Sequence, residues 1–410
     1  MFDVKKIREL FPWFNYHREM VYFDNSATSL KPACVIDAYR EYFCNFSTNP
    51  HNVSNEFTYN LKKKIELSRK KMAQFLNCNY DNLVFSASAT ESLNMFAFGL
   101  RKIVKKHDNV VIPEFEHSSN ILPWYELSKI TGASIRIVRQ KKPVLSIQSL
   151  LNCIDKNTKV FSFSNCNNLL GFGCDAKKIS SLIKKKYPQI IICLDATQYM
   201  QHHRLNLSLL SEIDFCAFSL HKLYGPTGVG VAYIGNNLLF ALEPWKLGGG
   251  CYEFYSNNPS KMYKLLDNNA RFEAGTPNVS GIFAVSNTID FLQKLDWNEM
   301  LCHEMNLSKR LISNLKTIPN VTVVTKNPIA PIVSFFYKDI PSQDIADYLG
   351  RNNIIVRAGH SCAPLVCQSL GQPDGYVRIS LGCYNTVNEV DFLIKKMRSF
   401  RKGDVVLNNE

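Results

Sequence analysis

Residues 219–230 read SLHKLYGPTGVG and directly follow the short apolar run Phe215–Phe218. One lysine, Lys222, therefore stands between a predicted buried strand and a glycine-rich turn. Burial in an apolar site lowers the pKa of an amine and makes it a nucleophile, as a lysine that forms a Schiff base requires. An exposed lysine in an ordinary surface loop is the other interpretation, and this segment alone does not decide between them.

Short apolar runs recur along the first two thirds of the chain and alternate with helical patterns. Residues 61–76 carry apolar side chains at helical spacing with lysines between them, and residues 179–186 show the same pattern. The sequence therefore predicts an α/β fold in which a mainly parallel sheet is flanked by helices on both faces. The predicted strands are Leu83–Phe85, Val110–Ile112, Ser134–Val138, Val160–Phe163, Ile190–Leu194 and Phe215–Phe218.

The pattern changes after about residue 265, where long helices are followed by two short strands, Val321–Val324 and Ile332–Phe336. A chain of 410 residues is long enough for two or three domains. We therefore expect a large domain over residues 21–265 that contains the sheet, and a smaller α+β domain over residues 266–410. Residues 1–20 are expected to form an arm that packs on the small domain.

The composition argues against several classes of function. Hydrophobic residues make up 46% of the chain, yet no apolar run reaches the ~18 residues of a membrane helix. The N-terminal sequence MFDVKKIREL places charges where a secretory signal has its apolar core, so we expect a cytoplasmic protein without a membrane partner. The net charge of +13 comes from short lysine groups on predicted helices, without interleaved aromatic residues, and does not predict a nucleic-acid partner.

Thirteen cysteines are present, and no two of them are spaced as CxxC. This spacing argues against a zinc ribbon and against a thioredoxin-type centre, and we expect no metal site. Most of the cysteines stand among apolar neighbours and are expected to be reduced core thiols. Any catalytic cysteine has to be identified from its setting.

Two further strand ends carry polar residues. Leu83–Phe85 runs into SASATES, residues 86–92, just before an apolar helix whose free N–H groups and dipole favour a phosphate. A simple helix cap explains this segment equally well. The run Ile190–Leu194 ends in Asp195, a carboxylate that needs a partner such as a protonated ring nitrogen, a structural arginine or a helix end.

The ligands of open parallel sheets lie beyond the carboxyl ends of the strands, so these three segments are expected to meet. Together they offer a phosphate cup, a carboxylate and an amine. Pyridoxal phosphate has a phosphate, a ring nitrogen and an aldehyde that need those three groups. We therefore expect pyridoxal phosphate as the cofactor, with Lys222 as its covalent attachment point.

Specific motifs are spread over nearly the whole chain. They are VYFDNSATSLKP at 21–32, EHSSNILPW at 116–124, LDATQ at 194–198, SLHKLYGPTG at 219–228, RFEAGTPN at 271–278, VRAGHSCAPL at 356–365 and VRISLGCYNT at 377–386. With these motifs the sequence is similar to the SUF-type, or group II, cysteine desulfurases in the class V aminotransferase branch of the fold-type I pyridoxal-phosphate enzymes. The resemblance implies a large cofactor-binding domain and a small domain that carries the catalytic cysteine loop.

The resemblance assigns cofactor-binding roles by position. It implies that Lys222 holds the cofactor and later moves the substrate Cα proton, and that Asp195 pairs with the pyridinium nitrogen. Gln198 would bond to the phenolic oxygen, and His117 would stack on the ring and assist proton transfer. A homodimer is implied as well, because one of the phosphate ligands would come from the neighbouring subunit. The implied phosphate ligands are Thr90, Ser219 and His221, with Thr276 supplied by that subunit.

The resemblance also assigns the substrate and the nucleophile. L-Cysteine would be bound through its carboxylate by Arg378, with help from Asn165 and Arg357, because a guanidinium binds carboxylates at two points. Cys362 would take the sulfur as a persulfide and leave L-alanine, with Arg357 and His360 as positive neighbours that favour the thiolate. The sulfur would then pass to an acceptor or scaffold protein of an iron–sulfur cluster assembly system.

Other activities fit parts of the same pattern. A selenocysteine lyase or a cysteine-sulfinate lyase would share nearly all of these residues. A class V aminotransferase would share the lysine and aspartate but would have no use for the cysteine of the RxGxxC loop. A binding protein that kept an inactive enzyme fold is disfavoured, because Lys222, Asp195, His117 and Arg378 are all present.

The chain departs from the family pattern at several places. The usual His-His-Cys is His360-Ser361-Cys362, and SNCNNLLGFG at 164–173 replaces a pattern nearer SNVLGxxNP. Gln343 stands where relatives with a zinc-bound sulfur acceptor tend to have a histidine. The last departure leaves the kind of acceptor open.

Overall fold

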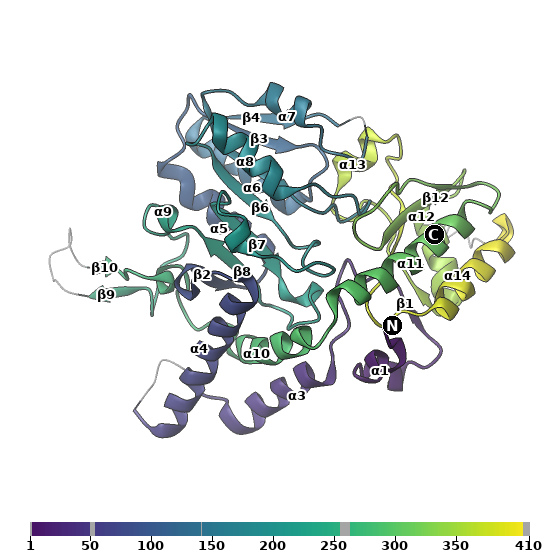
Figure 1. The fold of residues 1–410 in the computed structure, drawn as a ribbon, viewed down its shortest axis with the longest axis horizontal. Coiled ribbons are helices and arrows are strands. Elements are labelled where there is room, and N and C mark those ends of the chain that lie inside the picture. The colour runs from purple at the N-terminus through teal and green to yellow at the C-terminus, as the bar shows by residue number, and fades with distance from the viewer. Residues whose placement is uncertain (1, 50–53, 141, 255–262, 405–410) are drawn as a thin grey trace, which may run out of the picture.

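The computed structural model describes residues 2–49, 54–140, 142–254 and 263–404, and a central sheet dominates it (Figure 1). Strands β7, β6, β5, β3 and β4 run parallel, and β8 is antiparallel to both of its neighbours, β2 and β7. The predicted α/β fold with a mainly parallel sheet is confirmed. The strands, in spatial order, are β2 (Leu83–Ser86), β8 (Gly230–Ile234), β7 (Phe215–Ser219), β6 (Ile191–Asp195), β5 (Thr158–Ser164), β3 (Asn109–Pro113) and β4 (Ser134–Val138).

Apart from the edge strand β4, whose residues are mostly only partly buried, the sheet is buried on both faces, which explains why its other strands are nearly continuous apolar runs. Alternate side chains of one strand point to opposite faces, so Phe161 and Phe163 pack with one helical layer and Val160 with the other. Among the described residues, no helix combines the length and the apolar character needed to span a bilayer. The first layer includes α4 (Glu56–Leu76), α8 (Ala176–Lys186) and α10 (Val279–Gln293), and the second includes α5 (Ala89–Gly99) and α6 (Leu122–Thr131).

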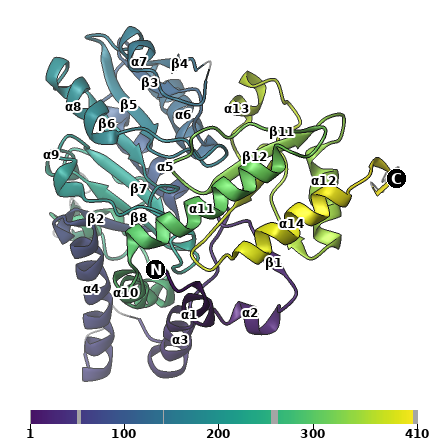
Figure 2. The ribbon, with the colours of Figure 1, turned by 45° about the vertical axis from the view of Figure 1, so that its right-hand side comes forward.

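The residues after α10 build a second, smaller sheet. Its strand order is β11-β12-β14, and both strand pairs are antiparallel. Helices α11 and α14 lie side by side against it, as Figure 2 shows. Its elements are α11 (Trp297–Leu315), β11 (Val321–Val323), β12 (Ile332–Tyr337), α12 (Ser342–Arg351), β14 (Val377–Ser380) and α14 (Val387–Ser399).

The N-terminal residues contact the C-terminal elements. The guanidinium of Arg8, on α1 (Val4–Glu9), donates to the carboxylate of Glu389 at 2.8 Å. The short strand β1 (Val21–Tyr22) pairs in parallel with β13 (Ile354–Ile355). The predicted domain limits remain a prediction. The packing of α10 against α4 and α3 (Ala33–Glu41) favours a limit between α10 and α11 over one at residue 265.

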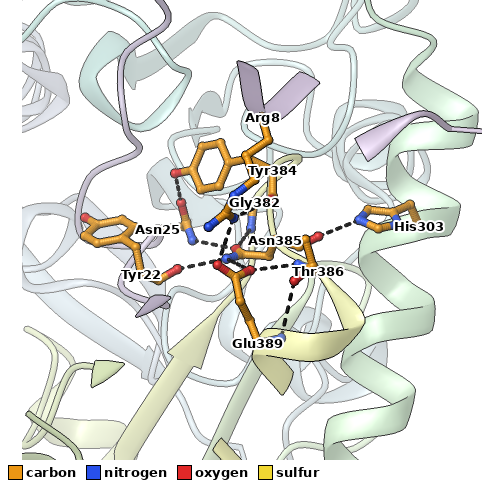
Figure 3. A network of polar contacts seen from close by, with 9 residues as sticks. All are labelled: Arg8, Tyr22, Asn25, His303, Gly382, Tyr384, Asn385, Thr386 and Glu389. Atoms are coloured by element: carbon orange, nitrogen blue, oxygen red, sulfur yellow. Dashed lines mark hydrogen bonds and ion pairs between the residues drawn. The ribbon is translucent and has the colours of Figure 1, made fainter. Parts of the chain in front are cut away.

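Asn385 is the centre of a buried polar network that joins these segments (Figure 3). His303 of α11 bonds to its carbonyl oxygen at 2.8 Å. Because buried polar groups need partners, this network fixes the segment around residues 22–25 beside the start of α14. The Asn385 side chain bonds to the carbonyl of Tyr22 (3.0 Å), the carboxylate of Glu389 (3.2 Å), the N–H of Gly382 (2.8 Å) and the amide of Asn25 (3.3 Å).

Replacing Asn385 with alanine should lower the free energy of unfolding by about 2–4 kcal/mol, because it leaves the buried carbonyl of Tyr22 and the N–H of Gly382 without their partner. Urea denaturation followed by circular dichroism measures the change. The control is Asn298→Ala, which removes an exposed side chain of α11 and should change the stability by less than about 0.5 kcal/mol. Equal stability of the two variants would contradict the importance of the network.

Candidate active site

A cavity of about 280 Å³ opens at the carboxyl ends of β5, β6 and β7. Ser164, Asp195 and Ser219, the last residues of these three strands, all line it. Segments of the C-terminal half close the other side with Arg357, Cys362 and others. The cavity therefore lies at the edge where an open parallel sheet binds its ligands, as the sequence predicts.

Lys222 ends a short 3-10 turn directly after β7 and lines the cavity. Burial of the amine, together with the nearby Arg378 guanidinium, lowers the pKa of Lys222 to about 8, while the Asp195 carboxylate opposes this shift. About a tenth of the amine is therefore neutral at pH 7, far more than for an exposed lysine. The carbonyl of His221 accepts hydrogen bonds from several groups of residues 28–31, which hold the turn in place.

Asp195 is buried at the end of β6, where its carboxylate accepts the N–H of Thr197 at 2.9 Å. Gln198 lines the cavity beside it, and its side-chain nitrogen donates to Gln201 at 3.1 Å. The side-chain oxygen of Gln198 and the hydroxyl of Thr197 are buried without a partner among the described residues. These unpaired groups leave hydrogen-bonding capacity for a ligand in the cavity.

His117 and His221 line the cavity as neutral imidazoles. Burial first, and then the charge of Lys222, lowers the pKa of each to about 4. The Nδ1 atom of His117 accepts the N–H of Ser119 at 3.1 Å, so the proton of the neutral ring is on Nε2. A neutral ring with one free N–H suits stacking and proton transfer better than a fixed cation does.

The N-terminus of α5, which begins at Ala89 within the SASATES segment, lines the cavity. Ser88 caps this helix by accepting the N–H of Glu91, and Ser219 accepts the N–H of Ala89 at 2.7 Å. The hydroxyl of Thr90 lies 2.7 Å from that of Ser119. Hydroxyl groups at a helix N-terminus form a site for a phosphate. Thr90, Ser219 and His221 all line the cavity as expected, and Ser88 is a lining residue that the sequence did not single out.

Arg378, on β14, is buried and held by two fixed partners. Its Nη2 donates to Asp24 at 2.9 Å, and its Nη1 donates to the carbonyl of Asn168 at 3.0 Å. The Nε atom is buried without a partner among the described residues, which leaves a donor for a carboxylate ligand. Neither Asp24 nor Asn168 was predicted as a site residue, although both lie in segments that the sequence singled out.

Two predicted site residues do not line the cavity of this chain. Asn165 was expected to help bind the substrate, but Asn168 lines the cavity in its place. After β5 the chain turns, because the side chain of Asn167 accepts the N–H groups of Leu169 and Leu170, and this turn brings Asn168 to the cavity. Thr276 is exposed in the loop before α10, away from the cavity.

Cys362 is an exposed cysteine on a turn that closes the cavity. Its carbonyl accepts two hydrogen bonds from Ser118, the residue after His117. Arg357 lines the cavity on the same side, and its backbone pairs with that of Arg378. The structure therefore brings a thiol, an amine and a carboxylate-binding guanidinium into one cavity.

The residues present fit pyridoxal phosphate. A weakly basic amine, a buried carboxylate and an anion-binding helix end share one cavity, and buried donors and acceptors stand ready without partners among the described residues. The fold and the site together define a pyridoxal-phosphate enzyme of fold type I.

Comparison with known proteins gives the family. Residues 21–393 match the family model for aminotransferase class V. A protein of Ureaplasma parvum named "Probable cysteine desulfurase" is 40% identical, over 97% of this chain and 98% of its own length. The solved structure of the apo cysteine desulfurase of Thermococcus onnurineus has a TM-score of 0.90 at 32% identity and covers 96% of this chain and 97% of its own. The cysteine desulfurase CsdA of Escherichia coli has a TM-score of 0.88 at 27% identity, with 97% and 98% covered. The chain therefore belongs to the class V aminotransferase family and, within it, to the cysteine desulfurases, whose cofactor is pyridoxal phosphate.

Replacing Arg378 with methionine should raise the pKa of Lys222 above about 8, because removing a nearby cation favours the ammonium form. The pKa should stay below its ordinary value, since burial is the larger cause. The rate of acetylation of Lys222 against pH, followed by mass spectrometry on cofactor-free protein, measures the shift. Arg310→Met, which removes an exposed arginine of α11, is the control. An unchanged titration in Arg378→Met would refute the electrostatic link.

Proposed function

We propose that this cysteine desulfurase is of the SUF type and that Cys362 takes the sulfur of L-cysteine as a persulfide, which leaves L-alanine. The observation that carries the proposal is the position of Cys362 in the wall of the cavity that also contains Lys222 and Arg378. An aminotransferase would have no use for a thiol at this place. The same chemistry needs a nucleophile that can reach both the bound substrate and a partner protein, and Cys362 is exposed.

Substrate binding depends on Arg378. Its free Nε–H and remaining Nη–H groups would bind the carboxylate of L-cysteine, with Asn168 and Arg357 beside it. Asp24 holds the guanidinium in one orientation and partly balances its charge. Removing the partner of a buried charge is costly, so the ion pair keeps the clamp in place between turnovers.

Each cofactor group has a residue that would hold it. Lys222 would attach it covalently and then move the proton at the substrate Cα, and Asp195 would pair with the ring nitrogen. Bound pyridoxal phosphate supplies an electron sink for the substrate carbon skeleton. Gln198 would bond to the phenolic oxygen, and His117 would stack on the ring. The phosphate would be held by Thr90, Ser219 and His221.

The transfer of sulfur is a nucleophilic displacement at the sulfur atom of the substrate. The Cys362 thiolate forms an S–S bond to the substrate sulfur while the Cβ–S bond of the substrate breaks. The electron pair of that bond stays with the carbon skeleton, which is then protonated and leaves as alanine. The sulfur remains on Cys362 as a persulfide until an acceptor thiolate takes it.

The acceptor would be a protein of an iron–sulfur cluster assembly system. Its thiol can reach the persulfide because Cys362 is exposed. We also propose that the enzyme works in the cytoplasm. All thirteen cysteines lie in the described part of the chain and none of them is in a disulfide, which fits a reducing compartment.

Replacing Cys362 with alanine should lower alanine release by roughly 10³-fold or more, because no thiolate is left to take the sulfur. Cysteine should still change the absorption of the bound cofactor, since Lys222, Asp195 and Arg378 are untouched. Mass spectrometry of wild type treated with cysteine and no reductant should show one added sulfur on the peptide with Cys362.

The matched control is Cys367→Ala. Cys367 is buried, and burial raises its pKa to about 11, so its thiol stays protonated and unreactive near neutral pH. This variant should keep most of the activity. A wild-type rate in Cys362→Ala, or added sulfur on Cys367, would overturn the proposed mechanism.

We further propose a homodimer in which Thr276 reaches the phosphate of the neighbouring subunit. Its exposure and its place outside the cavity of its own chain support this role. Thr276→Ala should weaken cofactor retention about tenfold, because a hydrogen bond to a charged group is lost. Dialysis followed by absorption measures retention, and Thr322→Ala, on the exposed side of β11, is the control. A fully active monomer in sedimentation at micromolar concentration would refute the dimer.

A further inference from the structure

The turn that carries Cys362 has an unfavourable backbone conformation. Ser361 and Cys362 have φ angles of 49° and 57°, so two successive residues other than glycine lie in the left-handed region. Side chains with a Cβ atom rarely adopt this conformation, and it persists only where the surroundings hold it. Contacts around the turn must therefore compensate for the strain.

Those contacts come from two loops beyond the central sheet. The side-chain nitrogen of Asn168 donates to the carbonyl of Ser361 at 2.7 Å. The backbone N–H and the hydroxyl of Ser118 both donate to the carbonyl of Cys362, each at 2.8 Å. The carbonyl groups of both strained residues are thus bound from the side of the large sheet, and none of these three hydrogen bonds comes from the turn itself.

The two anchors also connect the turn to the rest of the site. Asn168 is buried, lines the cavity, and accepts Nη1 of Arg378 through its backbone carbonyl at 3.0 Å. Ser118 directly follows His117 in the chain. The conformation of the nucleophile turn is therefore tied to the residue that would bind the substrate carboxylate and to the histidine that would face the cofactor ring.

We propose that Asn168 and Ser118 are positioning residues that hold the Ser361–Cys362 turn in its left-handed conformation, so that the Cys362 thiol stays in the cavity wall and in reach of the substrate sulfur. The proposal rests on the proposed function of Cys362 as the sulfur acceptor. Neither side chain takes part in the bond-forming step. Their effect is on the orientation of the nucleophile, which strongly influences the rate of a displacement.

The test uses the pyridoxal-phosphate holoenzyme of wild type, Asn168→Ala and Ser118→Ala. Quenched mass spectrometry in a single turnover measures how fast sulfur appears on Cys362, and we expect a loss of about tenfold in each variant. The KM for cysteine should change less than about twofold in Ser118→Ala, because Ser118 is not among the residues that line the cavity. Deuterium uptake in the peptide that contains Cys362 should rise in both variants.

A second substitution that restores the rate of sulfur transfer distinguishes a positioning role of Asn168 from a general loss of structure in the variant. Ser361→Gly in the Asn168→Ala background should recover most of the lost rate, because glycine adopts the left-handed conformation without strain. The matched control is Asp339→Gly in the same background. Asp339 has a φ of 60° and lies outside the cavity, so this change relieves a similar strain elsewhere and should recover nothing.

Wild-type sulfur transfer and wild-type deuterium uptake in both Asn168→Ala and Ser118→Ala would overturn the proposal, as would equal rescue by Ser361→Gly and Asp339→Gly. The proposed function fails by a different result, namely wild-type turnover in Cys362→Ala. An inactive Cys362→Ala together with fully active anchor variants would refute only the positioning role.

Discussion

The ion pair between the buried guanidinium of Arg378 and the carboxylate of Asp24 constrains the rest of this structure. A buried positive charge is tolerated only with a partner, and these two residues are 354 positions apart in the chain. The segment that carries Asp24 must therefore lie along β14. There the backbone of Asp24 forms an isolated parallel β-bridge with Ser380, and the side chain of Asn25 donates to the carbonyl of Ser380. The network around Asn385 continues this connection to α11 and α14, so the segment around Asp24 and the segment around Arg378 are held together beside the cavity.

The charge balance of the cavity follows from the same pair. Asp24 neutralises much of the positive charge of Arg378. The charges of Lys222 and Asp195 are opposite and act on each other across the cavity. His117 and His221 contribute no positive charge near neutral pH, because burial and the nearby Lys222 lower the pKa of each to about 4. Arg357 and the N-terminus of α5, which also line the cavity, contribute further positive potential. A ligand with a phosphate at one end and a carboxylate at the other matches this distribution.

The sequence predicts local features well and long-range ones poorly. Each predicted strand of the central sheet is present. Most of these strands are buried on both faces and form a continuous apolar run, while the edge strand β4 is only partly buried. Lys222 and Asp195 stand at strand ends that the sheet brings together. Strand β8 was missed, since it directly follows the glycine-rich turn and its antiparallel pairing depends on partners far away in the chain. The sequence pointed to Asn165 instead of Asn168. The hydrogen bonds of the Asn167 side chain turn the chain after β5, and a single sequence does not reveal such a turn.

Exposure decides which cysteine can carry sulfur. Cys166 also lines the cavity, but burial and the Asp195 charge raise its pKa, so its thiol stays protonated and no acceptor protein could reach it. A sulfur carrier has to meet the substrate inside the cavity and a partner outside it, and a buried residue such as Cys166, two positions after the end of β5, cannot do both. A residue on a turn at the rim can. Placing a thiol there requires a sharp reversal of the chain, which explains why two left-handed residues lie at Ser361 and Cys362 and why neighbouring loops bind both of their carbonyl groups.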